Sequence, residues 1–189
     1  MGKNVKELLE ELKNVSELML DLAYSAVFFE SKDIAREVIL LSDSVSKLEE
    51  DLYLHLFAIS KKMSKRLISV IELVETSKKV AAAAKNLGEL VLEGKELHPV
   101  IKVALKETDE SIVRVKISKN SIMANKTLGE LKFRSNTGLD VIAIRRRKKW
   151  IFDPKKNTRI YPGDVIIAVG SLESCRRAKD IANGKIQEL

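Results

Sequence analysis

The sequence predicts an α+β protein in which an antiparallel bundle of helices precedes a small domain with the element order β-α-β-β-β-α. The first observation is a change of period, because apolar residues recur every three or four positions up to residue 91 and alternate from residue 112. The second is a change of charge. Residues 1–110 hold 16 Lys and Arg against 20 Asp and Glu, whereas residues 111–189 hold 18 against 7. A chain of 189 residues can form two small domains, so we predict domains at 1–110 and 111–189.

Three long amphipathic helices are predicted in the first domain. Their apolar stripes cover residues 5–29, residues 33–56 and residues 67–91. Neither glycine nor proline, the residues that break helices, occurs between Gly2 and Gly88. Proline is favoured at the first position of a helix, so Pro99 predicts a short fourth helix that ends near Lys106.

The second domain begins with an alternating segment, residues 112–117, which is typical of a strand with one exposed face. Residues 127–131 predict a short helix that residues 135–138 end. Two further strands are predicted at residues 141–144 and 150–152.

The closing elements of this domain follow a turn. Pro162 and Gly163 suit the two central positions of a type II turn, since proline presets φ and glycine accepts a positive φ. The apolar run at residues 165–170 predicts a strand buried on both faces. Ser171 is a suitable N-cap for a final helix at residues 172–182.

A run of five basic residues, Arg145 to Lys149, lies between two predicted strands. We predict that Arg146, Arg147, Lys148 and Lys149 contact an anion or a partner. A nucleic acid, an anionic membrane surface or a phosphorylated small ligand would each satisfy this charge, and a solvated hairpin is an equal alternative. The domain has few aromatic residues that could stack on bases, so we expect no stable nucleic acid partner.

Polar residues that border the break after the predicted helix form a second candidate site. We predict a small-ligand site at Arg134, Asn136 and Arg145. The alternative is that these side chains cap a turn and carry solvated charge.

A divalent metal site on the helical bundle is a third candidate. Glu17 and Asp21 lie four residues apart and therefore share one face of a helix. The alternative is a solvated acidic face, because helices rich in Glu and Asp produce such pairs by chance.

Sequence motifs of catalysis are missing. The chain has neither a Gly-x-x-x-x-Gly-Lys phosphate loop nor a Gly-x-Gly-x-x-Gly fingerprint, so we predict that it is not an enzyme. A single cysteine, Cys175, excludes an internal disulfide framework. No apolar run reaches the roughly 20 residues that span a bilayer. We therefore expect a soluble cytoplasmic protein without a transmembrane segment.

Four short segments together resemble the TrkA-type C-terminal domain, also called the regulator-of-potassium-conductance C-terminal domain. They are residues 94–100, 121–131, 141–145 and 162–166, and the resemblance covers residues 111–182. The helices before this domain resemble a half-length PhoU-like bundle. The chain is thus similar to potassium-transport-related proteins that join these two domains.

The resemblance implies a cytosolic homodimer that regulates or accompanies a membrane potassium or other monovalent cation transporter subunit, at the periphery of the membrane. It also implies a small ligand, such as cyclic di-AMP or another nucleotide, at the dimer interface of the C-terminal domain. The helices replace the family's usual Rossmann domain, so NAD or ATP sensing is not expected. PhoU-like helices often bind metal through paired carboxylates; Glu17 and Asp21 match that pattern, whereas Glu75 is followed four residues later by Lys79.

Two alternatives to a potassium-transport regulator stay open. One is a PhoU-like adaptor of phosphate-response signalling, in which a partner recognises the acidic bundle. The other is a basic nucleic-acid or anionic-surface binder that uses Arg145 to Lys149.

Overall fold

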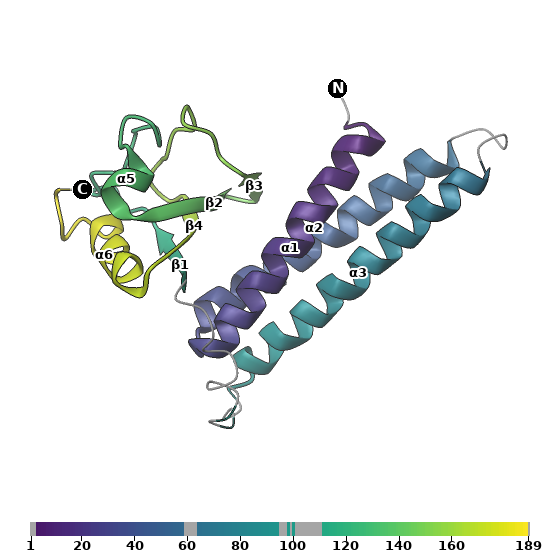
Figure 1. Ribbon diagram of the computed structural model, residues 1–189, viewed down its shortest axis with the longest axis horizontal. Coiled ribbons are helices and arrows are strands. Elements are labelled where there is room, and N and C mark those ends of the chain that lie inside the picture. Colours follow the sequence, from purple (N-terminus) through teal and green to yellow (C-terminus); the bar gives the residue numbers. More distant parts are fainter. Residues whose placement is uncertain (1–2, 59–63, 95–97, 99, 101–110, 189) are drawn as a thin grey trace. The chain divides into compact units, whose positions relative to one another are not determined.

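The computed structural model describes residues 3–58, 64–94, 98, 100 and 111–188 (Figure 1). The chain divides into two compact units, Met1–Leu105 and Lys106–Leu189. The helix predicted from Pro99 to about Lys106 lies outside the described residues, apart from Val100. We call the two units the bundle and the β unit and treat each by itself.

The bundle consists of three long helices, as the apolar stripes predict. They are α1 (Val5–Phe28), α2 (Lys32–Phe57) and α3 (Ser64–Leu92), and each contacts the other two (Figure 1). Side-chain caps fix where the first two begin. The Asn4 side chain accepts a hydrogen bond from the Glu7 amide at 3.0 Å, and the Glu7 carboxylate accepts one from the Asn4 amide at 2.9 Å. The Ser31 side chain caps α2 by accepting a hydrogen bond from the Ile34 amide.

The core of the bundle is uneven in side-chain size. Helices α1 and α2 bury large residues, among them Leu12, Met19 and Leu41, each at most 1% exposed. Helix α3 buries mainly small ones, such as Ala81 and Ala84. Small side chains let helix axes approach closely, so α3 packs near its neighbours through its alanine-rich stretch.

The β unit has the predicted element order. It contains, in sequence, β1 (Ser111–Lys116), α5 (Phe133–Thr137), β2 (Leu139–Arg146), β3 (Lys149–Phe152), β4 (Val165–Gly170) and α6 (Leu172–Ala182). The four strands form one sheet in the order β1-β4-β2-β3, and every neighbouring pair is antiparallel. Strand β4 therefore lies in the interior of the sheet, which explains its continuous apolar run.

The turn before β4 is the predicted one. Gly163 has a φ of 88°, and the Asp164 amide donates to the Tyr161 carbonyl at 3.0 Å. The Gly163 amide also donates to the Ile117 carbonyl at 2.8 Å, which ties the turn to the end of β1. The predicted helix after Ser171 is confirmed as α6 with the same bounds.

The prediction of a helix at residues 127–131 is wrong. This segment forms hydrogen-bonded turns, and the helix comes later, as α5, in the residues that we expected to end it. The physical reason is competition for backbone donors. The amides of Leu128 and Gly129 donate to the carbonyls of Thr158 and Lys156, at 3.0 and 2.7 Å, so tertiary contacts replace a continued helix.

Cys175 lies in the core of the β unit, 4% exposed, with its thiol 3.4 Å from the Ser111 carbonyl. Burial raises the pKa of this thiol, so little thiolate forms near neutral pH. We expect a thiol reagent such as Ellman's reagent to label the native protein at least about 100-fold more slowly than the protein in concentrated guanidinium chloride. Equal rates in the two states would contradict this placement.

Candidate anion and ligand sites

A basic pocket of about 1040 Å³ opens beside the β2–β3 hairpin. Strand β1, the hairpin and the turn before β4 all contribute to its walls. Among the described residues that line it are seven Lys or Arg side chains and a single carboxylate, Asp164; the basic ones are Arg114, Lys116, Arg145, Arg146, Arg147, Lys148 and Lys149. The predicted run of basic residues thus forms part of a concave surface, joined by two cations from β1.

The hairpin that carries the run is tight. Arg146 on β2 is opposite Lys149 on β3, which leaves Arg147 and Lys148 as a two-residue loop. Arg147 adopts a φ of 56°, a left-handed conformation that residues other than glycine rarely take. Arg147, Lys148 and Lys149 are exposed, so three of the four predicted anion contacts face solvent at the pocket.

The fourth predicted anion contact, Arg146, is held by contacts within the protein. Its Nε donates to Asp164 Oδ1 at 3.0 Å and its Nη2 donates to Asp164 Oδ2 at 2.8 Å, a two-pronged pair. Nη2 also donates to the Arg159 carbonyl at 2.6 Å, and the guanidinium lies 4.4 Å from the centre of the Tyr161 ring. The hydrogen bond to Asp164 raises the pKa of Arg146. Arg146 therefore neutralises the Asp164 carboxylate.

Asp164 is 2% exposed and serves the turn as well as the ion pair. Its Oδ2 accepts a hydrogen bond from the Tyr161 amide at 2.9 Å, within the turn that Gly163 closes. The sequence indicates this local bond, but it does not indicate the pair with Arg146, eighteen residues earlier. The pairing of β2 with β4 is what brings the two side chains together.

The three residues of the predicted ligand site occupy two places. Arg134 and Asn136 lie in α5, before β2 begins, and both are exposed. Arg134 Nη1 is 3.8 Å from Asp140 Oδ2, and Asn136 Nδ2 donates to the Leu131 carbonyl at 2.8 Å. Arg145 lies near the far end of β2, where it lines the basic pocket and donates to the Arg147 carbonyl at 3.0 Å. Within this chain, Arg145 therefore lies apart from Arg134 and Asn136, near the opposite end of β2.

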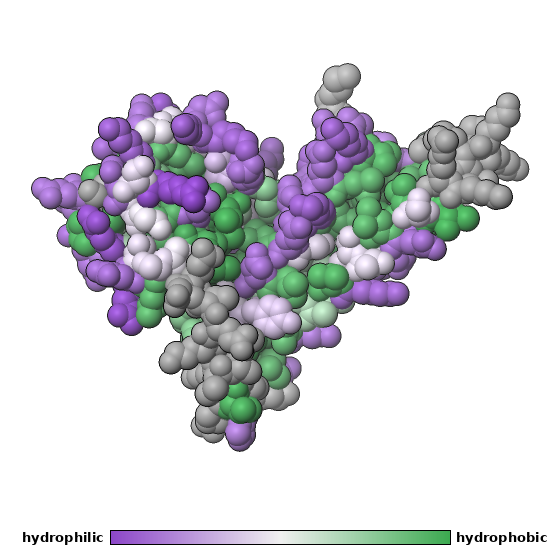
Figure 2. Space-filling model, in the orientation of Figure 1, coloured by the Kyte–Doolittle hydropathy of each residue, from purple (hydrophilic) through white to green (hydrophobic). Residues whose placement is uncertain are grey.

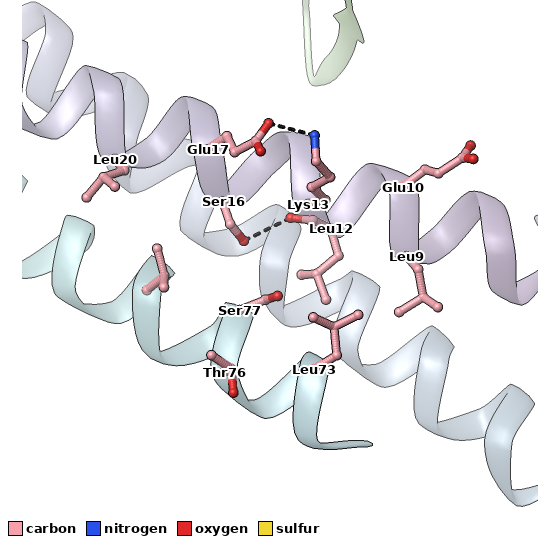
Figure 3. A pocket seen from close by; sticks show the side chains of 11 residues that line it. Leu9, Glu10, Leu12, Lys13, Ser16, Glu17, Leu20, Leu73, Thr76 and Ser77 are labelled. Carbon is pink, nitrogen blue, oxygen red and sulfur yellow. Dashed lines mark hydrogen bonds and ion pairs between the residues drawn. The ribbon is translucent and has the colours of Figure 1, made fainter. Parts of the chain in front are cut away.

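On the bundle, a groove of about 440 Å³ runs between α1 and α3, and Figure 3 shows its side chains. Apolar residues including Leu9, Leu20 and Leu73 line it. Apolar surface is also visible among the charged side chains of the bundle in Figure 2. Glu17 lies at the edge of the groove and accepts a hydrogen bond from Lys13 Nζ at 3.0 Å. The carboxylate predicted as a metal ligand thus has a lysine partner from its own helix.

The second predicted metal ligand, Asp21, has a pKa raised by partial burial and by the charge of Glu17. Across the described part of the chain, no group of three or more His, Cys, Asp or Glu side chains converges on one point. On α3, the Glu75 carboxylate accepts a hydrogen bond from the Tyr53 hydroxyl, which raises the pKa of Tyr53 to about 12. Glu17 and Glu75 therefore accept hydrogen bonds from side chains within the bundle.

The sequence holds no apolar run long enough to span a bilayer. Within the ranges that the structure describes, no helix combines the length and the apolar character needed to cross a bilayer.

The fold defines a two-domain α+β protein, in which a three-helix bundle precedes a small antiparallel module with a charged pocket. Comparison with known families identifies both parts. Residues 9–91 match the PhoU domain, and residues 112–183 match the TrkA-C domain. The chain therefore joins a PhoU domain to a TrkA-C domain, which confirms the resemblance seen in the sequence.

Relatives of the chain include potassium transport proteins. It is 34% identical over 95 residues to "Probable potassium channel protein 2" of Methanocaldococcus jannaschii, a match that covers 49% of this chain and 28% of that protein. It is also 34% identical over 71 residues to "Ktr system potassium uptake protein C" of Bacillus subtilis, which covers 38% of this chain and 32% of that protein. The chain thus spans about a third or less of the length of these relatives.

Two solved structures are similar to part of this chain. One is the RCK_C domain dimer of S. agalactiae BusR in complex with c-di-AMP, with 30% identity and a TM-score of 0.37, covering 38% of this chain and 95% of that one. The other is the RCK C domain of the potassium transport protein KtrA in complex with cyclic diadenosine monophosphate, with 28% identity and a TM-score of 0.36, covering 43% and 94%.

Proposed function

We propose that this chain is a non-enzymatic regulatory protein of potassium or other monovalent cation transport. In this proposal it is a cytoplasmic homodimer that acts on a membrane transporter subunit. The observation that carries the proposal is the TrkA-C match over residues 112–183, in a chain whose relatives include a potassium channel protein and a potassium uptake protein.

The proposed ligand of the paired TrkA-C domains is cyclic di-AMP or another nucleotide, as the family resemblance implies. Arg134 and Asn136 are suited to contact it because both are exposed on the short helix α5. A ligand can shift a protein between two arrangements only by binding one of them more tightly. We propose that the occupied dimer favours one arrangement of the bundles and so changes the state of the transporter.

Isothermal titration calorimetry of the purified protein with cyclic di-AMP, and separately with ATP, tests the ligand. We expect Arg134→Ala to weaken nucleotide binding about tenfold or more, since a charge-assisted hydrogen bond contributes about 1.5–3 kcal/mol. Arg176→Ala removes the same charge from an exposed position on α6 and is the matched control. Binding of neither nucleotide would remove the ligand from the proposal.

Light scattering tests the dimer, and a monomer at all concentrations would remove the paired-domain mechanism.

Deletion of the gene tests the pathway by two readouts, potassium uptake and the phosphate-starvation response. The PhoU match over residues 9–91 favours the second candidate, a phosphate-response adaptor. That candidate replaces the first if only the phosphate response changes.

A further inference from the structure

We propose that the basic pocket of the β unit binds a phosphate-bearing anion, at a place separate from the α5 residues. The ligand is either a free phosphorylated small molecule or the phosphate headgroup of an anionic lipid, because both present the same group. This inference does not depend on a nucleotide site at Arg134 and Asn136.

The first support is the charge balance of the pocket. Seven cationic side chains from β1 and the hairpin line it, against Asp164 as the one carboxylate among the described lining residues. Arg146 already neutralises Asp164 through hydrogen bonds to both of its carboxylate oxygens. Excess positive charge in a concave, partly apolar surface focuses the electrostatic potential and raises the local concentration of anions.

The second support is that the part of the pocket wall around Arg146 is fixed before any ligand arrives. Arg146 is held by Asp164, by the Arg159 carbonyl and by the face of Tyr161, so this part of the wall has little freedom. The neighbouring hairpin pairs Arg145 with Trp150 and Arg146 with Lys149. A paired hairpin backbone leaves only the side chains of these cations to be ordered when an anion binds.

The third support is backbone strain at the loop. Arg147 has a φ of 56° at an exposed position where glycine would be unstrained. A two-residue hairpin loop requires a positive φ at its first residue, and this chain has arginine there instead of glycine. Here the side chain is a guanidinium at the mouth of the pocket, and a guanidinium matches the geometry of a phosphate group.

The test uses Trp150, which lines the pocket and is the single tryptophan of the chain. Inorganic pyrophosphate is the probe, and binding to the full-length protein is followed by tryptophan fluorescence and by calorimetry. We expect saturable binding that Lys148→Ala with Lys149→Ala weakens about tenfold or more at low salt. The matched control is Lys155→Ala with Lys156→Ala, an adjacent lysine pair outside the pocket lining, which should change affinity by less than about twofold.

Arg147→Gly is the second variant, because it removes a charge at a position where glycine suits the backbone. We expect it to remain folded and to bind pyrophosphate several-fold more weakly. No pyrophosphate binding by the wild type, or equal losses in the pocket and control pairs, would overturn the proposal.

Two further experiments identify the kind of molecule that carries the phosphate group. Flotation with phosphatidylglycerol vesicles, displaced by pyrophosphate, supports a lipid headgroup, whereas pyrophosphate binding without flotation supports a free molecule. Binding of random-sequence duplex DNA that pyrophosphate fails to displace would overturn the proposal in favour of a nucleic acid surface. The Lys148 and Lys149 substitutions should leave cyclic di-AMP binding intact, so failure here is distinguishable from failure of the proposed nucleotide site.

Discussion

Replacing Arg146 with methionine is expected to lower the free energy of unfolding of the β unit by about 3 kcal/mol. The substitution keeps an apolar stem against Tyr161 but leaves the Asp164 carboxylate, 2% exposed, without its guanidinium partner. Removing one member of a buried ion pair costs about 3–5 kcal/mol, and we take the lower end because the Arg146 side chain is itself 34% exposed. Guanidinium chloride unfolding followed by Trp150 fluorescence reports this unit.

Arg134→Met is the matched control for that measurement. Arg134 also pairs with an aspartate in the β unit, Asp140, but both side chains are mostly exposed and the atoms are 3.8 Å apart. Exposed pairs contribute about 0–1 kcal/mol, so the control should lose less than about 1 kcal/mol. Similar losses for the two variants would contradict a structural role for the Arg146–Asp164 pair.

Gly170→Ala should also strongly destabilise the β unit, for a steric reason. A Cβ at Gly170, the last residue of β4, would lie 2.6 Å from the Gly138 carbonyl oxygen and 2.6 Å from Leu139 Cδ2. The first of these atoms belongs to the backbone immediately before β2, and moving it would disturb the pairing of Leu139 with Gly170. We expect a loss of about 2–3 kcal/mol, typical of overpacking a fixed interior. Thermal and denaturant unfolding both measure it.

Gly163→Ala separates steric overlap from backbone strain. A Cβ at Gly163 would have open space for 4 Å around it beyond the adjacent residues, but φ is 88°. The expected loss is therefore limited to the left-handed conformation, about 1–2 kcal/mol. If Gly163→Ala were the more damaging of the two, the close approach at Gly170 would not be the controlling feature.

The sequence predicts most of the fold because periodicity and local turn chemistry determine it. The stripes of the three helices, the turn at Gly163 and the cap at Ser171 each depend on residues a few positions apart. The helix expected at residues 127–131 was wrong because the amides of Leu128 and Gly129 bond to residues 156–158, almost thirty positions away. No local pattern carries that information.

In the candidate sites too, local features are predictable from the sequence and those that depend on distant contacts are not. The basic run is visible in the sequence, and its position in a hairpin follows from the strands on either side. Two features are not visible: β1 adds Arg114 and Lys116 to the pocket, and Arg146 is bonded to Asp164. Both depend on strand order, β1-β4-β2-β3, which adjacent segments do not determine.

That strand order has a consequence for biosynthesis. Strand β4 follows the other three strands out of the ribosome, yet it is the one that β1 and β2 both pair with. A nascent chain that has not yet reached Gly170 holds β1 and the β2–β3 hairpin with no strand to join them. The helices of the bundle are translated earlier and can pack before that moment. The basic pocket, whose walls come from both sides of β4, is therefore among the last parts of the protein to form.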